Sequence, residues 1–150
     1  MLGKLDQTQM ETLLQQQVTG HIGCHADGVT YIVPVNYVYS APYVYCHSAK
    51  GKKIEMMRRN PNVCFQVDEI RSIFNWQSVV AWGIFEEVTD VEESERLMQG
   101  LIHRIMPLAN DPGDHPSHGI TENDYDIGNG VDLIIYKIHL EKMTGRFEHH

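Results

Sequence analysis

The segment HSAKGKK, residues 47–53, contains the residue types of an anion-binding site. It lies between two apolar runs, so we expect it to join the end of a strand to the start of a helix. The first-turn amides of a helix are unpaired and carry the positive end of its dipole, which favours an anion there. Ser48 can donate a hydrogen bond, Gly51 permits close backbone approach, and Lys52 and Lys53 add positive charge. On spacing alone, however, a solvated lysine-rich turn is the better interpretation.

The chain as a whole is acidic, so the positive charge of this segment is a local feature. Asp and Glu outnumber Lys and Arg by 20 to 12, which gives a formal charge of -8. Such a field repels nucleic acid and anionic membranes, and we expect neither as a partner. No apolar stretch approaches the roughly 20 residues that span a bilayer, and the first residues lack the apolar centre of a signal peptide. We therefore expect a cytoplasmic protein.

The hydrophobic pattern on both sides of the segment predicts a mainly β fold. With 150 residues and 42% hydrophobic composition, residues 1–150 are expected to form one domain. Alternating apolar residues predict strands over 18–25, 29–38, 43–48, 62–69, 76–88 and 132–145. Helical spacing predicts helices over 6–17, 51–60 and 90–106. Short, mostly hairpin-linked strands without βαβ alternation favour a closed barrel or a sandwich over a parallel sheet, and a small antiparallel barrel with helices at its edges is the first choice.

Three further features refine this expectation. Gly83 interrupts the strand predicted over 76–88, which indicates a bulge or a close backbone approach. Residues 107–130 contain many loop-forming types and predict a long irregular or partly helical segment. The three cysteines each lie inside an alternating apolar segment and form no CxxC pair, so we expect reduced, buried thiols.

The order of three motifs resembles that of a family of flavin-binding proteins. VPVNYVY, YCHSAKGKKIEMMRRNPNVCFQVDE and WQSVVAWGIFEEV are spaced as in the pyridoxamine 5'-phosphate oxidase-like, FMN-binding split-barrel superfamily. Within it, the chain looks most like the nitroimidazole-resistance (Nim) branch. The resemblance covers residues 10–106 and the family-like ending EKMTG. It implies a six-stranded antiparallel split β-barrel with peripheral helices.

The resemblance also implies a cofactor and the residues that hold it. The implied cofactor is FMN, bound at the interface of a homodimer, with each flavin touched by both chains. By position, the flavin ring would lie largely against the backbone of Val33, Pro34, Val35 and Asn36. The phosphate would be held by His47, Ser48, Lys52 and Lys53, and the ring or ribityl chain would be approached by Gln77 and Ser78.

The activity implied by the resemblance is FMN-dependent redox chemistry on a small molecule. The flavin ring would carry that chemistry, so no catalytic side chain is assigned. By analogy alone, the substrate is a small aromatic such as a nitro compound. Tyr31, Asn36 and Gln77 stand where the true pyridoxamine phosphate oxidases carry basic residues, which argues against that oxidase activity. The alternatives are a flavin-binding or sensing module without turnover, and a haem-binding split barrel.

Nine histidines raise a competing metal-binding interpretation. The densest local group is in residues 111–118, which contain two His and two Asp. Loops hold such residues for solubility, and a metal site needs three or four ligands in fixed geometry, so no metal site is predicted. His21 and His25 would lie about 13 Å apart on one strand face, at ~3.3 Å per residue, and do not form a ligand pair.

Overall fold

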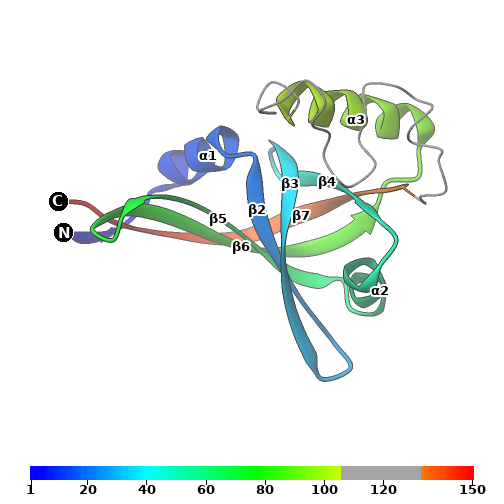
Figure 1. Cartoon of the computed structure of the whole chain (residues 1–150), viewed down its shortest axis with the longest axis horizontal. Helices are drawn as coiled ribbons and strands as arrows, with labels where there is room; N and C mark the ends of the chain where they lie inside the picture. The colour runs from blue at the N-terminus through cyan, green and yellow to red at the C-terminus, as the bar shows by residue number, and fades with distance from the viewer. Residues whose placement is uncertain (106–132) are drawn as a thin grey trace.

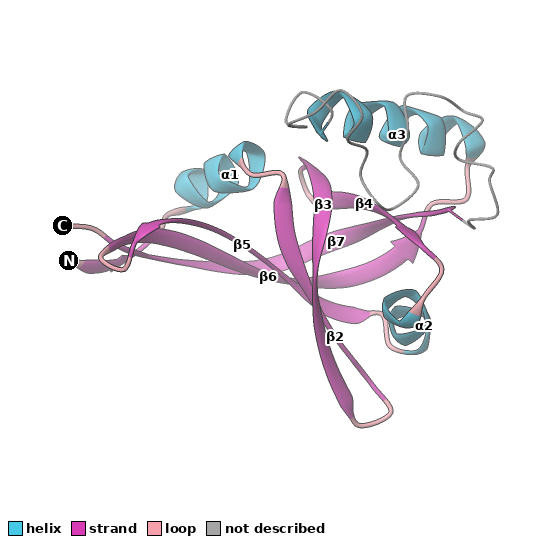
Figure 2. Cartoon of the chain, in the orientation of Figure 1, coloured by secondary structure: helices cyan, strands magenta, loops and turns pink. Residues whose placement is uncertain are grey.

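Seven antiparallel strands form one sheet in the computed structural model, which describes residues 1–105 and 133–150. The ring order is β7–β4–β3–β2–β5–β6, closed by pairing of β6 with β7, and β1 is attached to β7. Figures 1 and 2 show the helices on the outside of this ring. The elements are β1 (Leu2–Lys4), α1 (Gln7–Gln16), β2 (Thr19–Ala26), β3 (Val29–Ser40), β4 (Tyr43–Ala49), α2 (Lys52–Arg59), β5 (Asn62–Ser72), β6 (Asn75–Glu87), α3 (Val91–Ile105) and β7 (Leu133–Glu148). The predicted antiparallel barrel is confirmed.

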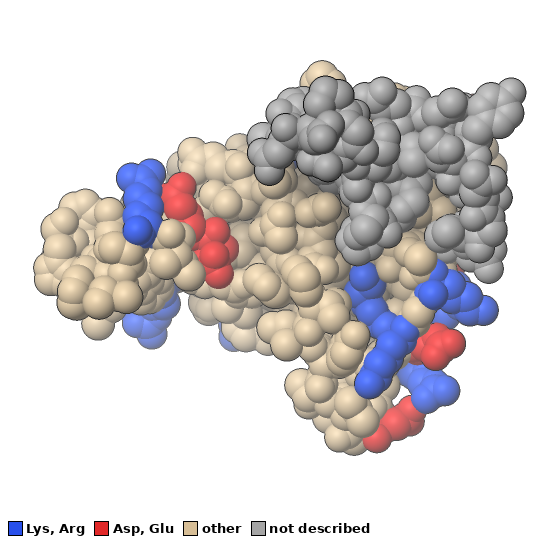
Figure 3. All heavy atoms as spheres, viewed as in Figure 1, with Lys and Arg blue, Asp and Glu red and all other residues tan. Residues whose placement is uncertain are grey.

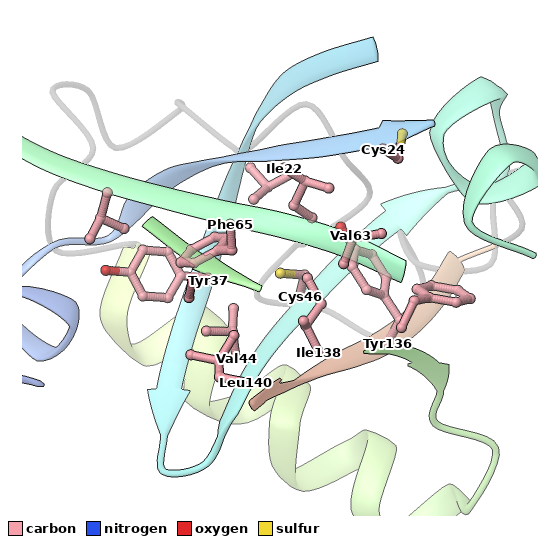
Figure 4. Packing of buried hydrophobic residues seen from close by; sticks show 14 of the residues in the cluster. Ile22, Cys24, Tyr37, Val44, Cys46, Val63, Phe65, Tyr136, Ile138 and Leu140 are labelled. Atoms are coloured by element: carbon pink, nitrogen blue, oxygen red, sulfur yellow. The ribbon is translucent and has the colours of Figure 1, made fainter. Parts of the chain in front are cut away.

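Strict alternation of side chains along the strands fills the interior of the barrel. On β2, Ile22 and Cys24 are buried while His25 is exposed, as expected when successive residues point to opposite faces. Tyr37 and Phe65 meet edge to face in the interior, with ring centroids 4.9 Å apart. Figure 4 shows these rings beside the aliphatic side chains of neighbouring strands. Each large side chain buried there stabilises the fold by roughly 1.5 to 3 kcal/mol.

Helix α1 is fixed at both ends. Asp6 and Gln9 form a reciprocal capping box at its start, which satisfies two otherwise unpaired backbone amides. At its end, Arg104 Nη2 donates to the carbonyls of Gln15 and Gln17 at 2.7 and 2.9 Å. These contacts tie α1 to α3 and hold α1 over the barrel, where its Leu residues are buried in the core.

Gly83 permits the bend at which β6 crosses β7, as the sequence predicts. The register between these strands shifts between Trp82 and Gly83. A Cβ atom at position 83 would lie 2.2 Å from the carbonyl oxygen of His139, far inside van der Waals contact. Only glycine fits there without displacement of the neighbouring backbone.

Several strand boundaries differ from those predicted from the pattern, among them the end of β5, which runs to Ser72 and not to residue 69. The short edge strand β1 was not predicted, because three residues are too few to show an alternation. β7 runs on to Glu148, three residues past Gly145, because β1 and β6 both pair with its last residues. The predicted irregular segment 107–130, and with it the candidate metal ligands in 111–118, lie outside the described residues.

The cysteines agree largely with the prediction. All three thiols are free, and those of Cys24 and Cys46 are buried, whereas that of Cys64 is only partly buried. Cys64 lies on the outward side of β5, which accounts for its exposure. Among the helices described, none is both long enough and apolar enough to cross a bilayer.

Candidate functional site

Ser48, Lys52 and Lys53 are brought together where β4 ends and α2 begins. Gly51 is the N-cap of α2 and offers no side chain to its first-turn amides, so these amides stay open to an external anion. Lys52 Nζ lies 4.9 Å from the centre of the Tyr31 ring, which orients this lysine beside β3. The Ser48 hydroxyl is buried and donates to the Ala49 carbonyl at 2.7 Å.

Lys53 is the most unusual charge in this region. Its side chain is partly buried, and burial lowers the pKa of its ammonium, an effect that the nearby Cys46 and Cys24 thiols oppose. Within residues 1–105 and 133–150, no carboxylate lies within ion-pair distance of it. A partly buried cation without a counter-charge is costly, so an anion bound here would offset an existing penalty.

The positive charge around α2 is concentrated on one part of the surface. Figure 3 shows Lys and Arg side chains gathered over α2, in a chain that is acidic overall. Arg58 and Arg59, in the last turn of the helix, are paired with Glu87 and Asp27. Lys52 and Lys53, in the first turn, have no carboxylate partner in the described part of the chain. The unneutralised charge therefore lies at the start of the helix, and a phosphate fits this end.

The thiol of Cys46 lies close enough to Lys53 to interact with it electrostatically. It is fully buried, and burial raises its pKa to about 12, so it is a neutral thiol at physiological pH. The Tyr136 hydroxyl contacts this thiol, and burial raises the pKa of Tyr136 well above its ordinary value. Figure 4 shows Cys46 and Tyr136 projecting into the same interior. These two groups pack the core and carry no charge to the site.

His47 points away from Ser48. It is paired with Ile135 on β7. On its other side, β3 pairs with β4 through Tyr37 and Cys46, so Asn36 is the next residue of β3 beside His47. Ile135 packs against α3, so His47 belongs to the outward side of the barrel, where it is 3% exposed. The predicted four-residue phosphate cradle is thus divided: Ser48, Lys52 and Lys53 lie near the junction of β4 and α2, and His47 lies on the other face of β4, near Asn36.

The candidate ring-contacting residues of β3 also alternate between faces. Val35 is buried in the core and Val33 packs against it, whereas Pro34 is exposed. The Asn36 side chain is partly exposed and accepts a hydrogen bond from Thr19 at 3.0 Å. A ligand on the outer wall would therefore meet the side chains of Pro34 and Asn36 and only the backbone between them.

Gln77 and Ser78 project to opposite faces of β6. Ser78 accepts a hydrogen bond from Gln66 at 3.0 Å on the outer wall. Gln77 donates to Glu69 at 3.2 Å on the inner side, beside the rim of the barrel. Because their side chains diverge, only Ser78 shares a face with Asn36. The two residues predicted to approach one ligand together are not brought together by their side chains.

Asn36 and Ser78 lie in one row across the outer wall of strands β3, β2, β5 and β6. Asn36 is paired with Thr19, and Ser78 is paired with Asp68. β2 and β5 pair through His21 and Gln66, and the same register continued by two residues places Thr19 opposite Asp68. Three strand spacings of about 4.8 Å separate the two ends of the row by roughly 14 Å. A flat ligand cannot lie against both ends of a convex wall, so one chain alone does not assemble these two residues around one ring.

Arg146 extends this row and was not assigned a role from the sequence. It is paired with Ser78 across β6 and β7, and its side chain is exposed. The structure records no carboxylate partner for it in residues 1–105 and 133–150. The residues around it, Thr144, Gly145 and Phe147, form no binding motif. Only the register between β6 and β7 shows that Arg146 lies beside Ser78.

Comparison with known proteins agrees with this architecture. The family model of pyridoxamine 5'-phosphate oxidase matches residues 6–147. An uncharacterized protein of Rhizobium meliloti is 32% identical over 127 residues, which are 83% of this chain and 81% of that protein. Among solved structures, a FAD-binding protein of Mesorhizobium loti has a TM-score of 0.75 and 27% identity, with 98% of each chain covered.

A second solved structure is similar at the level of the fold. A candidate 5-nitroimidazole antibiotic resistance protein of Bacteroides thetaiotaomicron has a TM-score of 0.72 and 23% identity, covering 98% of this chain and 87% of its own. At that identity the likeness concerns the fold. The family match, however, spans nearly the whole chain, and the closed six-stranded ring agrees with it. The chain belongs to the pyridoxamine 5'-phosphate oxidase family.

Proposed function

We propose that the chain binds FMN and holds the flavin phosphate at the start of α2. The observation that carries the proposal is Lys53, a partly buried ammonium with a lowered pKa and no carboxylate partner in the described residues. A phosphate would supply its counter-charge, and charge-assisted hydrogen bonds contribute roughly 1.5 to 3 kcal/mol each. Lys52 and the open first-turn amides complete the cradle, and Ser48 would join it by turning its hydroxyl from the Ala49 carbonyl to the phosphate. His47 would approach the ribityl chain from beside Asn36.

The flavin ring would then lie along Val33–Asn36, against the backbone and the two outward side chains. Pro34 and Asn36 lie on the outward side of β3, against which a planar ring can pack. Ser78 and Arg146 lie roughly 14 Å or more from Asn36 across the same chain, at about 4.8 Å per strand. They would approach the ring bound by a second chain.

We therefore propose a homodimer with two flavins at its interface. Two large apolar side chains on the outer wall support it: Ile32 is 67% exposed and Trp82 is 44% exposed. Ile32, Gly23, Cys64 and Trp82 form one row across four strands. Exposed apolar surface of this kind indicates a protein interface. If this wall is buried in a dimer, Ser78 and Arg146 of one chain would approach the flavin whose phosphate is held at the start of α2 of the other chain.

Bound flavin would supply two-electron redox chemistry, and the chain would supply the anchor, the orientation and the shielding from water. We propose an oxidoreductase that acts on a small aromatic substrate such as a nitro compound and works in the cytoplasm. Arg146 would present a cation to the ring from the partner chain and stabilise negative charge there during reduction. The proposed contacts contain no activated nucleophile, in keeping with chemistry carried by the cofactor.

FAD is the competing cofactor. The Mesorhizobium loti protein, at 27% identity, is named FAD-binding, and so is a Mycobacterium smegmatis protein with a TM-score of 0.64 and 22% identity. FMN and FAD share the ring, the ribityl chain and the first phosphate, so the cradle at Lys53 would serve either. Identification of the flavin released by heating, by chromatography against FMN and FAD standards, separates them.

The absorption spectrum of the purified or reconstituted protein tests the proposal. Flavin bands that bleach with a reduced nicotinamide donor, and return when a nitroaromatic compound is added, support the oxidoreductase. Flavin bands that do not respond indicate a binding or sensing module. A Soret band would indicate the haem-binding alternative, and failure of the apoprotein to bind any added flavin would refute the proposal.

A further inference from the structure

A separate cavity of about 320 Å³ lies at the rim of the barrel, between the start of α1 and the β5–β6 hairpin. Figure 1 shows α1 above this hairpin, with the two chain ends beside it. Gln77 lines the cavity on the inner side of β6, whereas Ser78 points to the outer wall. Gln77 thus faces the cavity from the side of β6 opposite to Ser78, while Trp76 and Glu148, on the outer side, line its edge. Its volume is at the lower end of the range for small-molecule sites.

One wall of the cavity is the ring of Phe147, which packs against the backbone of Gly3. Phe147 lines the cavity and is paired with Gly3 on β1. A Cβ atom at position 3 would lie 2.5 Å from two carbons of the Phe147 ring. The ring thus lies directly on the backbone of β1, in a position that any other residue at position 3 would disturb. Such a fixed ring can stack against a planar ligand.

Two amide side chains on facing walls have unused hydrogen-bonding atoms. Gln77 donates its amide to Glu69, which leaves Oε1 without a donor among the described residues. Gln9 accepts from the Asp6 amide through Oε1, which leaves its amide nitrogen without an acceptor in the same set. Gln77 and Gln9 both line the cavity, one from β6 and one from α1. Together they offer one acceptor and one donor to a ligand between them.

The charges in the cavity wall are only partly paired. Arg71 Nε lies 3.4 Å from Glu69 Oε1, whereas Glu148 accepts a hydrogen bond from the neutral Trp76 Nε1 at 3.2 Å. Two carboxylates and one guanidinium line the cavity, so an anionic ligand would be repelled and would also lose its own hydration. A neutral molecule that stacks on Phe147 and presents a donor and an acceptor together avoids both costs.

We propose that this cavity binds a small, uncharged planar ring carrying a carboxamide or a cyclic amide, whose carbonyl accepts from Gln9 and whose N–H donates to Gln77. The site is distinct from the flavin site and does not depend on flavin being bound. Its ligand class follows from the ring, the donor and the acceptor, and from the excess of carboxylates in the wall, which disfavours an anion.

Nicotinamide and nicotinic acid form a matched pair of probes, because they differ in the carboxamide alone. Each would be titrated into flavin-free protein, and binding would be followed through the backbone and side-chain amide signals in nitrogen-15 NMR spectra. Nicotinamide should shift the side-chain amide signals of Gln9 and Gln77 with a Kd in the roughly millimolar range. Nicotinic acid should bind about tenfold more weakly or not at all.

Two variants and two controls complete the test. Gln77→Met keeps the shape but removes the acceptor, and should weaken nicotinamide roughly 2- to 12-fold, the factor for one hydrogen bond. Gly3→Ala should displace the Phe147 ring and also weaken binding, whereas Gly100→Ala, with open space around it, should not. Gln7→Met, outside the cavity, is the control for Gln77→Met.

Equal affinity for the two probes, or equal binding by the variants and their controls, would overturn the proposal. Shifts confined to residues away from Gln9 and Gln77 would do the same. Flavin affinity of the Gly3→Ala protein, measured in parallel, keeps this outcome separate from that of the flavin proposal. If wild type and all variants fail to bind flavin while wild type still binds nicotinamide, the flavin proposal is refuted and the cavity proposal is not.

Discussion

Replacement of Lys53 by methionine should change flavin binding and stability in opposite directions. The side chain keeps its length and apolar stem but loses a partly buried charge that has no carboxylate partner in the described residues. Loss of one charge-assisted hydrogen bond to phosphate costs roughly 1.5 to 3 kcal/mol, which is about 10- to 150-fold in Kd. The apoprotein, in contrast, should unfold at the same or a higher temperature, because the cost of burying the ammonium is removed.

The assay is the quenching of flavin fluorescence on titration of apoprotein into FMN, with thermal unfolding of the apoprotein measured in parallel. Lys50→Met is the matched control, because Lys50 is exposed and lies outside the cradle. It should change Kd by less than about threefold, as expected for a screened surface charge. Riboflavin, which lacks the phosphate, should bind wild-type and Lys53→Met proteins equally. Unchanged FMN affinity in Lys53→Met, or a destabilised apoprotein with normal affinity, would refute the assignment of Lys53 to the phosphate.

Three further predictions concern pH and the scaffold. Burial lowers the pKa of Lys53, so its positive charge is present below that pKa and is lost at a lower pH than for an ordinary lysine. FMN affinity should therefore fall as pH rises through that lowered pKa, in titrations where riboflavin shows no such decline. Gly83→Ala forces a Cβ against the His139 carbonyl and should cost roughly 1 to 3 kcal/mol in urea unfolding, while Gly100→Ala, in an open helical position, should be neutral or stabilising. Arg104→Met removes two hydrogen bonds to carbonyls at the end of α1 and should accelerate amide exchange in α1 by about tenfold or more, with little change in β5 and β6. Uniform exchange throughout the chain would contradict that role.

The sequence predicts the barrel well because its strands are long and alternate clearly. On β2 the buried and partly exposed residues follow the pattern of the sequence residue by residue, and Gly83 marks the bulge. β1 and the end of β7 were missed because their positions depend on pairing between the two ends of the chain, which has no local signature. The spacing of the strands favoured a closed barrel, and the family resemblance, carried by the order of the motifs, contributed its six-stranded split form.

The candidate site was predicted less completely, because the motifs do not show to which face of the sheet each side chain points. The position of Lys52 and Lys53 at a helix start follows directly from the local sequence. That His47 and Ser48 diverge follows from alternation once β4 is known to continue through both. The place of Arg146 beside Ser78 depends on the register between β6 and β7, which passes through a bulge and cannot be counted from the sequence.

Native mass spectrometry of the protein reconstituted with FMN tests the flavin site at a dimer interface, because it weighs chains and flavins together. We expect a dimer of chains carrying two FMN molecules, and loss of both flavin and dimer when Ile32 and Trp82 on the outer wall are replaced by charged residues. A monomer that retains FMN would contradict the interface site, and a dimer that excludes FMN would contradict the flavin site itself.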